Sequence, residues 1–162
     1  MNTRADILSL LENNAKLTAS EIAVRLHMDP AAIADEIAEL ENQKVILGYH
    51  SVINWDLVEK ESVTGMIEIK ITPQRGQGFD RVAYRIYSYP QVKDCFLMSG
   101  GFDLMVIIEG NSLKEVAMFV SEKIAPLESV VSTYTHFILK KYKMQGTIYE
   151  SSQTESREAV VL

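Results

Sequence analysis

The chain has 162 residues, of which 47% are hydrophobic, and its formal net charge is −6. This hydrophobic content is enough for one ordinary domain or two small ones and argues against global disorder. The negative charge is concentrated near the start, where residues 1–60 hold 5 Lys and Arg against 10 Asp and Glu. Such a balance argues against nonspecific electrostatic attraction to nucleic acid or to an anionic membrane surface.

Cysteine content and hydropathy indicate the compartment. Cys95 is the only cysteine, which excludes an internal disulfide and fits a reducing environment. A small buried hydrophobic side chain is a better interpretation of Cys95 than a reactive thiol. Asp6 and Glu12 interrupt the apolar pattern at the start, unlike a secretory signal, and the longest apolar run, Leu104–Ile108, is too short to span a bilayer. We therefore expect a cytoplasmic protein without membrane association.

Two short helical patterns open the chain. The first begins near Thr3 and carries Ile7 and Leu11 on one face. The second begins at Thr18-x-x-Glu21, a capping box in which the two side chains bind free backbone N–H groups at the helix start. Each pattern is short and amphipathic, so the helices are expected to pack against further elements.

The third helix is predicted over residues 29–43, because Asp29 followed by Pro30 is typical of a helix start. Only about two residues separate it from the second helix, and this tight turn is the signature of a helix-turn-helix. Residues 45–53 then contain two short apolar stretches that predict a pair of strands, the wing. We predict a winged helix-turn-helix domain over residues 1–53; a generic three-helix module for protein contact is the alternative.

This third helix has an unusual charge for an element that reads DNA. Residues 29–43 hold five acidic side chains and no Lys or Arg. The face opposite the apolar stripe of Ile33, Ile37 and Leu40 would enter the major groove, where Arg or Lys normally reads guanine or holds phosphates. The residues predicted to meet DNA on this helix and the wing are Ala31, Ala32, Asp35, Glu36, Glu39, Lys44 and His50. The alternative for the carboxylates is a solvated helix face.

After a polar connector at residues 54–62, the hydrophobic pattern changes period. The expected elements are a strand at 63–72, a helix at 79–87, strands at 92–99 and 104–109, a helix at 113–124 and a strand at 130–139. This β-α-β-β-α-β order predicts an α+β chain whose second domain, residues 63–145, is a ferredoxin-like sandwich with both helices on one face of an antiparallel sheet.

The other face of that sheet also carries apolar residues and needs a cover. The simplest cover is the same sheet of a second subunit, which predicts a homodimer. Residues 146–162 are predicted to form a C-terminal tail, and the stretch KMQGTIYE, which begins at Lys143, is a candidate edge strand.

Three stretches resemble the Lrp/AsnC (leucine-responsive, or feast/famine) family of transcription regulators. They are the helix-turn-helix continuing into residues 45–49, the hairpin Ser99-Gly100-Gly101-Phe102-Asp103-Leu104, and the strand Thr133-Tyr134-Thr135-His136-Phe137-Ile138-Leu139. The resemblance implies a DNA-binding domain joined to an effector-binding regulatory (RAM) domain, in dimers assembled into octamers that respond to amino acids. The chain departs from the family pattern in three ways. The family's reading helix commonly carries Arg or Lys where this chain has Asp35, Glu36, Ala38 and Glu39, and Lys44 and Ser129 stand where the family has glycines.

The resemblance implies an effector site near that hairpin and the last strand. The candidate effector-binding residues are Ser99, Gly100, Gly101, Asp103, Thr133 and Thr135. Glycines let the backbone approach a small ligand, Asp103 can pair with an ammonium group, and the hydroxyls can position the ligand. The alternative is that the glycines permit the hairpin and Asp103 caps its turn.

No pattern indicates an enzyme. The histidines are scattered, and no cysteine and histidine cluster has metal-ligand spacing, so neither a metal site nor a cofactor is expected. Gly76-x-Gly78 is interpreted as a flexible loop. Two functions remain: a transcription regulator controlled by a small molecule, and an effector-sensing oligomer whose DNA binding is weak or lost because the reading helix is acidic.

Overall fold

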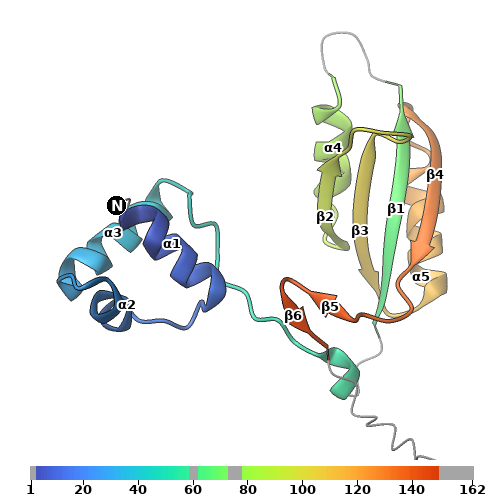
Figure 1. The fold of residues 1–162 in the computed structure, drawn as a ribbon. Helices are drawn as coiled ribbons and strands as arrows, with labels where there is room; N and C mark the ends of the chain where they lie inside the picture. The colour runs from blue at the N-terminus through green and yellow to red at the C-terminus, as the bar shows by residue number, and fades with distance from the viewer. Residues whose placement is uncertain (1–2, 59–61, 73–77, 150–162) are drawn as a thin grey trace, which may run out of the picture. The chain divides into compact units, whose positions relative to one another are not determined.

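A computed structural model describes residues 3–58, 62–72 and 78–149 of the chain (Figure 1). The chain divides into two compact units, Met1–Ile53 and Asn54–Leu162. Each unit has its own cluster of buried hydrophobic side chains and therefore its own core.

The N-terminal unit contains three helices, α1 (Thr3–Asn13), α2 (Ala19–Leu26) and α3 (Pro30–Asn42), close to the predicted spans. Their apolar stripes converge on one core, as the helical periodicity indicates. The buried members of this core are Ile7, Leu11, Leu17, Ile22, Ala23, Ile33 and Leu40.

The helix-turn-helix has the local chemistry predicted for it. Thr18 and Glu21 form the capping box of α2, with each side chain bound to the other residue's backbone N–H. His27 ends α2 in the left-handed conformation, at φ 55°, and so turns the chain sharply towards α3. Asp29 occupies the N-cap of α3 with Pro30 as the first helical residue, although the Asp29 side chain makes no capping hydrogen bond.

The predicted wing strands are wrong: residues 45–53 form no strand. The backbone N–H groups of Val45 and Ile46 both donate to the carbonyl oxygen of Leu40, at 2.9 and 3.1 Å, so this stretch caps α3. Residues 47–53 form no regular secondary structure. An isolated two-stranded hairpin is marginal in water, and an apolar stretch alone does not supply a partner.

The C-terminal unit is the predicted ferredoxin-like sandwich. Its elements are β1 (Val63–Ile71), α4 (Asp80–Tyr87), β2 (Val92–Leu97), β3 (Leu104–Gly110), α5 (Leu113–Phe119) and β4 (Val130–Phe137). The strands form one antiparallel sheet in the order β2-β3-β1-β4, and α4 and α5 lie on the same face of it (Figure 1).

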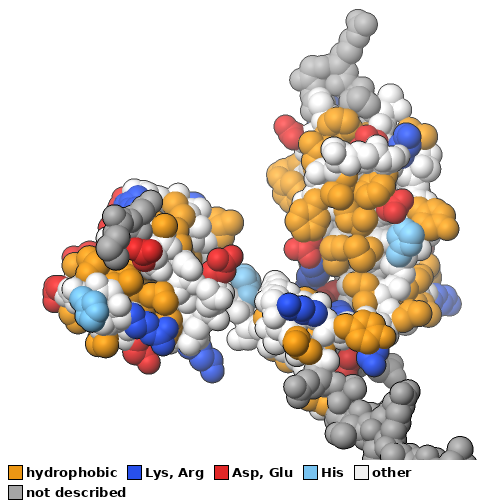
Figure 2. Space-filling view, in the orientation of Figure 1, with side chains coloured by type: hydrophobic (Ala, Val, Ile, Leu, Met, Phe, Trp, Pro, Cys, Tyr) orange, Lys and Arg blue, Asp and Glu red, His pale blue; other side chains and the backbone are white. Residues whose placement is uncertain are grey.

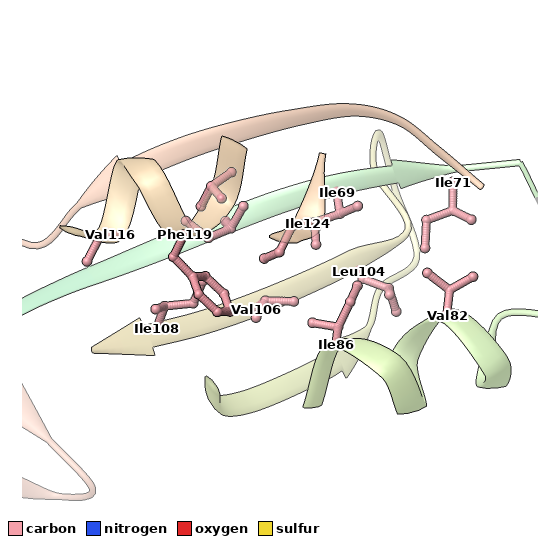
Figure 3. Packing of buried hydrophobic residues seen from close by; sticks show 12 residues of the cluster. Ile69, Ile71, Val82, Ile86, Leu104, Val106, Ile108, Val116, Phe119 and Ile124 are labelled. Carbon is pink, nitrogen blue, oxygen red and sulfur yellow. The ribbon is translucent and has the colours of Figure 1, made fainter. Parts of the chain in front are cut away.

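Alternate residues of the central strands build the core between the sheet and the helices. Ile67 and Ile69 of β1 and Val106 of β3 are fully buried, and they meet Ile86 of α4 and Val116 of α5 (Figure 3). Register pairs Ile69 with Leu104 on one side and with Thr133 on the other, so these three residues share one rung of the sheet.

Three details differ from the sequence prediction. The helix predicted over 113–124 is α-helical only to Phe119 and then continues as a π-helical turn, Val120–Ile124. The KMQGTIYE stretch is not an edge strand of the main sheet but a separate hairpin, β5 (Lys143–Met144) with β6 (Thr147–Ile148). The connector contains a short 3₁₀ helix, Trp55–Leu57. Gly76 lies outside the described residues.

Candidate functional site

The outer face of α3 is the candidate DNA-reading surface. Ala31, Ala32, Asp35 and Glu39 are exposed there, whereas Glu36 is half-buried. Ile33 and Leu40 are buried on the opposite side and fix the orientation of the helix against the core. The helix therefore presents the side predicted from its periodicity.

The flank of α3 that faces α1 carries a polar network. The guanidinium of Arg4 in α1 forms an ion pair with the carboxylate of Glu36 and donates a hydrogen bond to the side-chain oxygen of Gln43, at 3.1 Å. The Gln43 amide nitrogen in turn donates to Glu39 at 2.5 Å. Two of the acidic side chains predicted to meet DNA are thus held by neighbours within the unit.

The other flank is held by Tyr49, whose hydroxyl donates to the carboxylate of Glu41 at 2.8 Å. Burial raises the pKa of Tyr49, and the hydrogen bond to Glu41 and its charge raise it further. This hydrogen bond connects the segment that follows α3 to the helix.

The two predicted phosphate-binding residues lie on the exposed segment after α3. Lys44 adopts a left-handed backbone conformation, at φ 59°, immediately after the C-cap of the helix. His50 lies one residue beyond Tyr49. Both side chains reach solvent on the segment that the sequence assigned to the wing, although that segment contains no strand.

In the C-terminal unit, the hairpin between β2 and β3 contains four of the six predicted effector residues. It is closed by a backbone hydrogen bond from Met98 to Asp103, at 2.8 Å. Gly100 has φ 152°, a conformation that side-chain-bearing residues rarely adopt, and the space around both Gly100 and Gly101 is open. The hairpin therefore exposes its backbone to solvent at these two glycines.

Asp103 ties this hairpin to the end of β1. Its carboxylate accepts a hydrogen bond from the backbone N–H of Ile71 at 2.7 Å, and its own N–H donates to the carbonyl oxygen of Ile69. A carboxylate has more acceptor capacity than one hydrogen bond uses, so the structural role leaves room for a ligand.

Sequence reasoning missed Lys70 and Arg4. The Nζ atom of Lys70 lies 3.4 Å from the carbonyl oxygen of Gly101, which brings a cation to the hairpin from 31 residues earlier in the chain. Arg4 reaches α3 in the same way from α1. No sequence signal distinguishes either residue from other surface cations, because both contacts depend on tertiary packing.

Thr133 and Thr135 lie on β4 and are not part of the hairpin. They are half-buried, and their register with Ile69 and Ile67 directs them towards the helix-covered face of the sheet. Thr133 shares a rung with Leu104, so it lies at the same end of the sheet as the hairpin but about 10 Å away, across two strand spacings.

The sheet face without helices carries many hydrophobic side chains (Figure 2). Phe96 and Tyr134 are 50% and 66% exposed there, and Met105 and Ile107 are half-buried. Near this apolar surface, His136 Nε2 lies 3.1 Å from the carboxylate of Glu68. A large apolar face of this kind marks an interaction surface.

The described residues contain no candidate metal site and no candidate membrane-spanning helix. No group of three or more histidine, cysteine, aspartate or glutamate side chains within residues 3–58, 62–72 and 78–149 is placed to hold a metal ion. No helix in this part of the chain has the length and apolar character needed to cross a membrane.

Comparison with known proteins identifies both units. A family model described as the Lrp/AsnC ligand binding domain matches residues 64–148, and a winged helix-turn-helix DNA-binding model matches residues 2–46. The HTH-type transcriptional regulator YugG of Bacillus subtilis is 46% identical over 156 residues, which cover 96% of this chain and 94% of that protein.

Solved structures share the fold at low sequence identity. The leucine response regulatory protein LrpA of Mycobacterium tuberculosis superposes with a TM-score of 0.74 at 19% identity, covering 90% of this chain and 96% of the other. A transcriptional regulator of Neisseria meningitidis, solved as a complex with L-Met, superposes with a TM-score of 0.69 at 21% identity, covering 89% and 92%. The chain therefore belongs to the Lrp/AsnC family and is a transcription regulator that joins a helix-turn-helix DNA-binding domain to a ligand-binding domain.

Proposed function

We propose that the ligand of this regulator is an amino acid and that it binds at the hairpin Ser99–Asp103. The observation that carries the proposal is the presence of opposite charges at one exposed backbone turn. Lys70 approaches the Gly101 carbonyl, and Asp103 anchors the other end of the hairpin. An α-amino acid carries a carboxylate and an ammonium group, which match a lysine and an aspartate respectively. Gly100 and Gly101 have no side chains, so they leave open space for the carboxylate and ammonium groups of the amino acid.

The named relatives support this ligand class. One solved relative is an L-Met complex, and another is named as a leucine response regulator. Ser99 belongs to the same hairpin and supplies a hydroxyl. Thr133 and Thr135 are candidates for the side of the site formed by β4, with a weaker case because they are half-buried on the helix-covered face.

A melting-shift screen of the full-length protein against the twenty amino acids tests the ligand class. A ligand that binds only the native state raises the free energy of unfolding, by about 2.7 kcal/mol when its concentration is a hundred times its Kd. The melting midpoint rises as a result. We expect at least one amino acid to raise the midpoint in a saturable way, and Lys70→Gln to weaken that shift. Lys93→Gln is the control, since Lys93 is an exposed lysine on β2 that pairs with Glu109. No shift with any amino acid would contradict the proposal.

We further propose that the helix-free sheet face joins two copies of the chain, and that such dimers assemble into an octamer. The exposed apolar side chains on this face support a self-complementary interface, because burial of apolar surface drives association. An octamer has about eight times the chain mass of 18.2 kDa. Analytical ultracentrifugation measures this mass directly.

Tyr134→Glu tests the interface by placing a charge on β4, where the tyrosine is 66% exposed. We expect a shift to smaller species at micromolar concentration. Tyr84→Glu is the matched control, because Tyr84 on α4 is 61% exposed but lies on the opposite side of the unit. Equal behaviour of the two variants would contradict the assignment of the interface.

For the DNA interface we propose that Ala31, Ala32 and Asp35 approach the base edges and that Lys44 and His50 bind phosphates. Because the protein acts on DNA, we propose that it works in the cytoplasm. A gel-shift titration with the DNA upstream of its own gene at several salt concentrations tests the interface. Lys44→Gln should weaken binding to all sequences alike and lower the salt slope by about 1. An unchanged slope would contradict the phosphate contact.

A further inference from the structure

The outermost strip of α3 consists of Ala31, Asp35, Ala38 and Asn42. At 100° per residue these four positions lie opposite the fully buried Ile33, and all four are exposed. The strip offers two methyl groups, one carboxylate and one amide, and it contains no cation. It is about 16 Å long, at a rise of 1.5 Å per residue, and so spans four to five base steps.

The neighbouring carboxylates of α3 are already engaged. Glu36 pairs with Arg4, Glu39 accepts from Gln43, and Glu41 accepts from Tyr49. Within the described residues, the side chain of Asp35 has no hydrogen bond or ion pair, whereas its backbone belongs to the helix. It is therefore the one carboxylate on the strip that is available to a base.

We propose that Asp35 selects a cytosine in the DNA site and that Ala31 and Ala38 select thymines beside it. In the major groove, cytosine presents the N4 amino group as a donor, while guanine presents only the acceptors O6 and N7. An ionised carboxylate accepts hydrogen bonds and does not donate them. Asp35 therefore attracts cytosine and repels guanine at the same position, and adenine is a poorer partner because its N7 acceptor lies beside its N6 amino group. An alanine methyl gains most against the C5-methyl group of thymine.

This inference rests on DNA binding by the helix-turn-helix and adds the class of sequence that it reads. The repulsive part matters as much as the attractive part, because specificity is a difference between affinities. Phosphate contacts carry no sequence information, so discrimination among sites depends on the base edges that this strip meets. The carboxylate of Asp35 disfavours guanine there.

Selection from a random duplex DNA library with the full-length protein tests the cytosine assignment. We expect the wild-type motif to contain a cytosine whose replacement weakens binding about 5- to 150-fold, the range for one mismatched base pair. Asp35→Arg should change that position to guanine, and the isosteric Asp35→Asn should change it to adenine. Glu12→Arg, on an exposed position of α1, makes the same charge change and should leave the motif unchanged.

The outcomes separate this inference from DNA binding itself. Enrichment of a motif that Asp35→Arg and Asp35→Asn leave unchanged would overturn the cytosine assignment alone. Failure of the wild type to enrich any sequence would overturn DNA binding and the assignment together. A change of the motif with Glu12→Arg identical to that with Asp35→Arg would show a charge effect and would also overturn the assignment.

Replacing single thymines by deoxyuridine in the enriched site tests the methyl contacts, because only the C5-methyl group is removed. We expect binding to weaken about three- to fivefold at the two thymines that face Ala31 and Ala38, the effect of exposing one methyl-sized group. Uracil at thymines outside the recognised motif is the control. Equal affinity with uracil at every thymine would overturn the methyl contacts.

Discussion

Arg4, in the first turn of α1, forms an ion pair with Glu36 in the middle of α3. The same guanidinium holds Gln43, so one cation from the start of the chain binds the flank of the candidate reading helix at two positions. The contact compensates one negative charge of a helix that carries no Lys or Arg of its own. It leaves one fewer uncompensated carboxylate on α3.

Replacing Arg4 by alanine tests this relationship. The pair is partly exposed, with 45% and 31% of the two side chains accessible, so the loss of stability should be no more than about 1 kcal/mol. DNA affinity should fall several-fold, because Glu36 is left uncompensated near the phosphates. Adding Glu36→Gln to Arg4→Ala should restore affinity, and a double-mutant cycle measures the coupling. Independent effects of the two substitutions would contradict the relationship.

Lys44 occupies a left-handed conformation at the end of α3 without being glycine. For an ordinary residue this conformation costs about 1–2 kcal/mol, and glycine avoids that strain. Part of the gain is offset because glycine has more conformational freedom in the unfolded chain. We therefore expect Lys44→Gly to stabilise the protein by up to about 1 kcal/mol, measured as a higher urea midpoint. Lys44→Ala is the control, since it removes the same charge but keeps the strain. A gain with alanine equal to that with glycine would assign the effect to charge.

Periodicity and capping chemistry predicted the helices and the main sheet, because they act over a few residues. Thr18 with Glu21 marks a helix start that the structure contains. The alternation of Val63–Ile71 is matched by its burial pattern along β1.

One error concerns a local competition for hydrogen bonds, and the others concern contacts between distant positions. Val45 and Ile46 have the composition of a strand, but their N–H groups donate to the nearby Leu40 carbonyl and are not available to a partner strand. The contacts of Arg4 with Glu36 and of Lys70 with Gly101 each join positions more than 30 residues apart. The local sequence does not encode such contacts. The sequence therefore predicted which residues form the candidate site, but not the contacts between them.

The capping box of α2 should make stability depend on pH. The backbone N–H and the hydroxyl of Thr18 donate to Glu21 and hold the pKa of its carboxyl below the ordinary value of 4.5. A carboxyl with a lowered native pKa stabilises the fold above its unfolded pKa, and this contribution is lost as pH falls through the native pKa. Glu21→Gln should lower the urea midpoint at pH 7 and reduce its dependence on pH between 3 and 5. Parallel curves for the two proteins would contradict this.

Cys95 should react slowly in the folded protein. It is half-buried in β2, and burial raises the pKa of its thiol above the ordinary value of 9.0. Since the thiolate is the nucleophile, less of the reactive form is present at neutral pH. Alkylation by iodoacetamide at pH 7.5 should be slower in native protein than in urea. A native rate at or above the unfolded rate would contradict the assignment of Cys95 as a packed hydrophobic residue.

Asp103 combines a structural bond with the proposed binding of an ammonium group, and two substitutions separate these roles. Asp103→Asn keeps an acceptor for the Ile71 N–H, 2.7 Å away, but removes the charge. Asp103→Ala leaves that N–H unpaired and should cost about 1–3 kcal/mol. Stability in urea should therefore fall with alanine and change little with asparagine. If Asp103 also binds the ligand ammonium group, the melting shift caused by an amino acid should be lost in both variants. An asparagine variant that keeps the full shift would restrict Asp103 to its bond with Ile71.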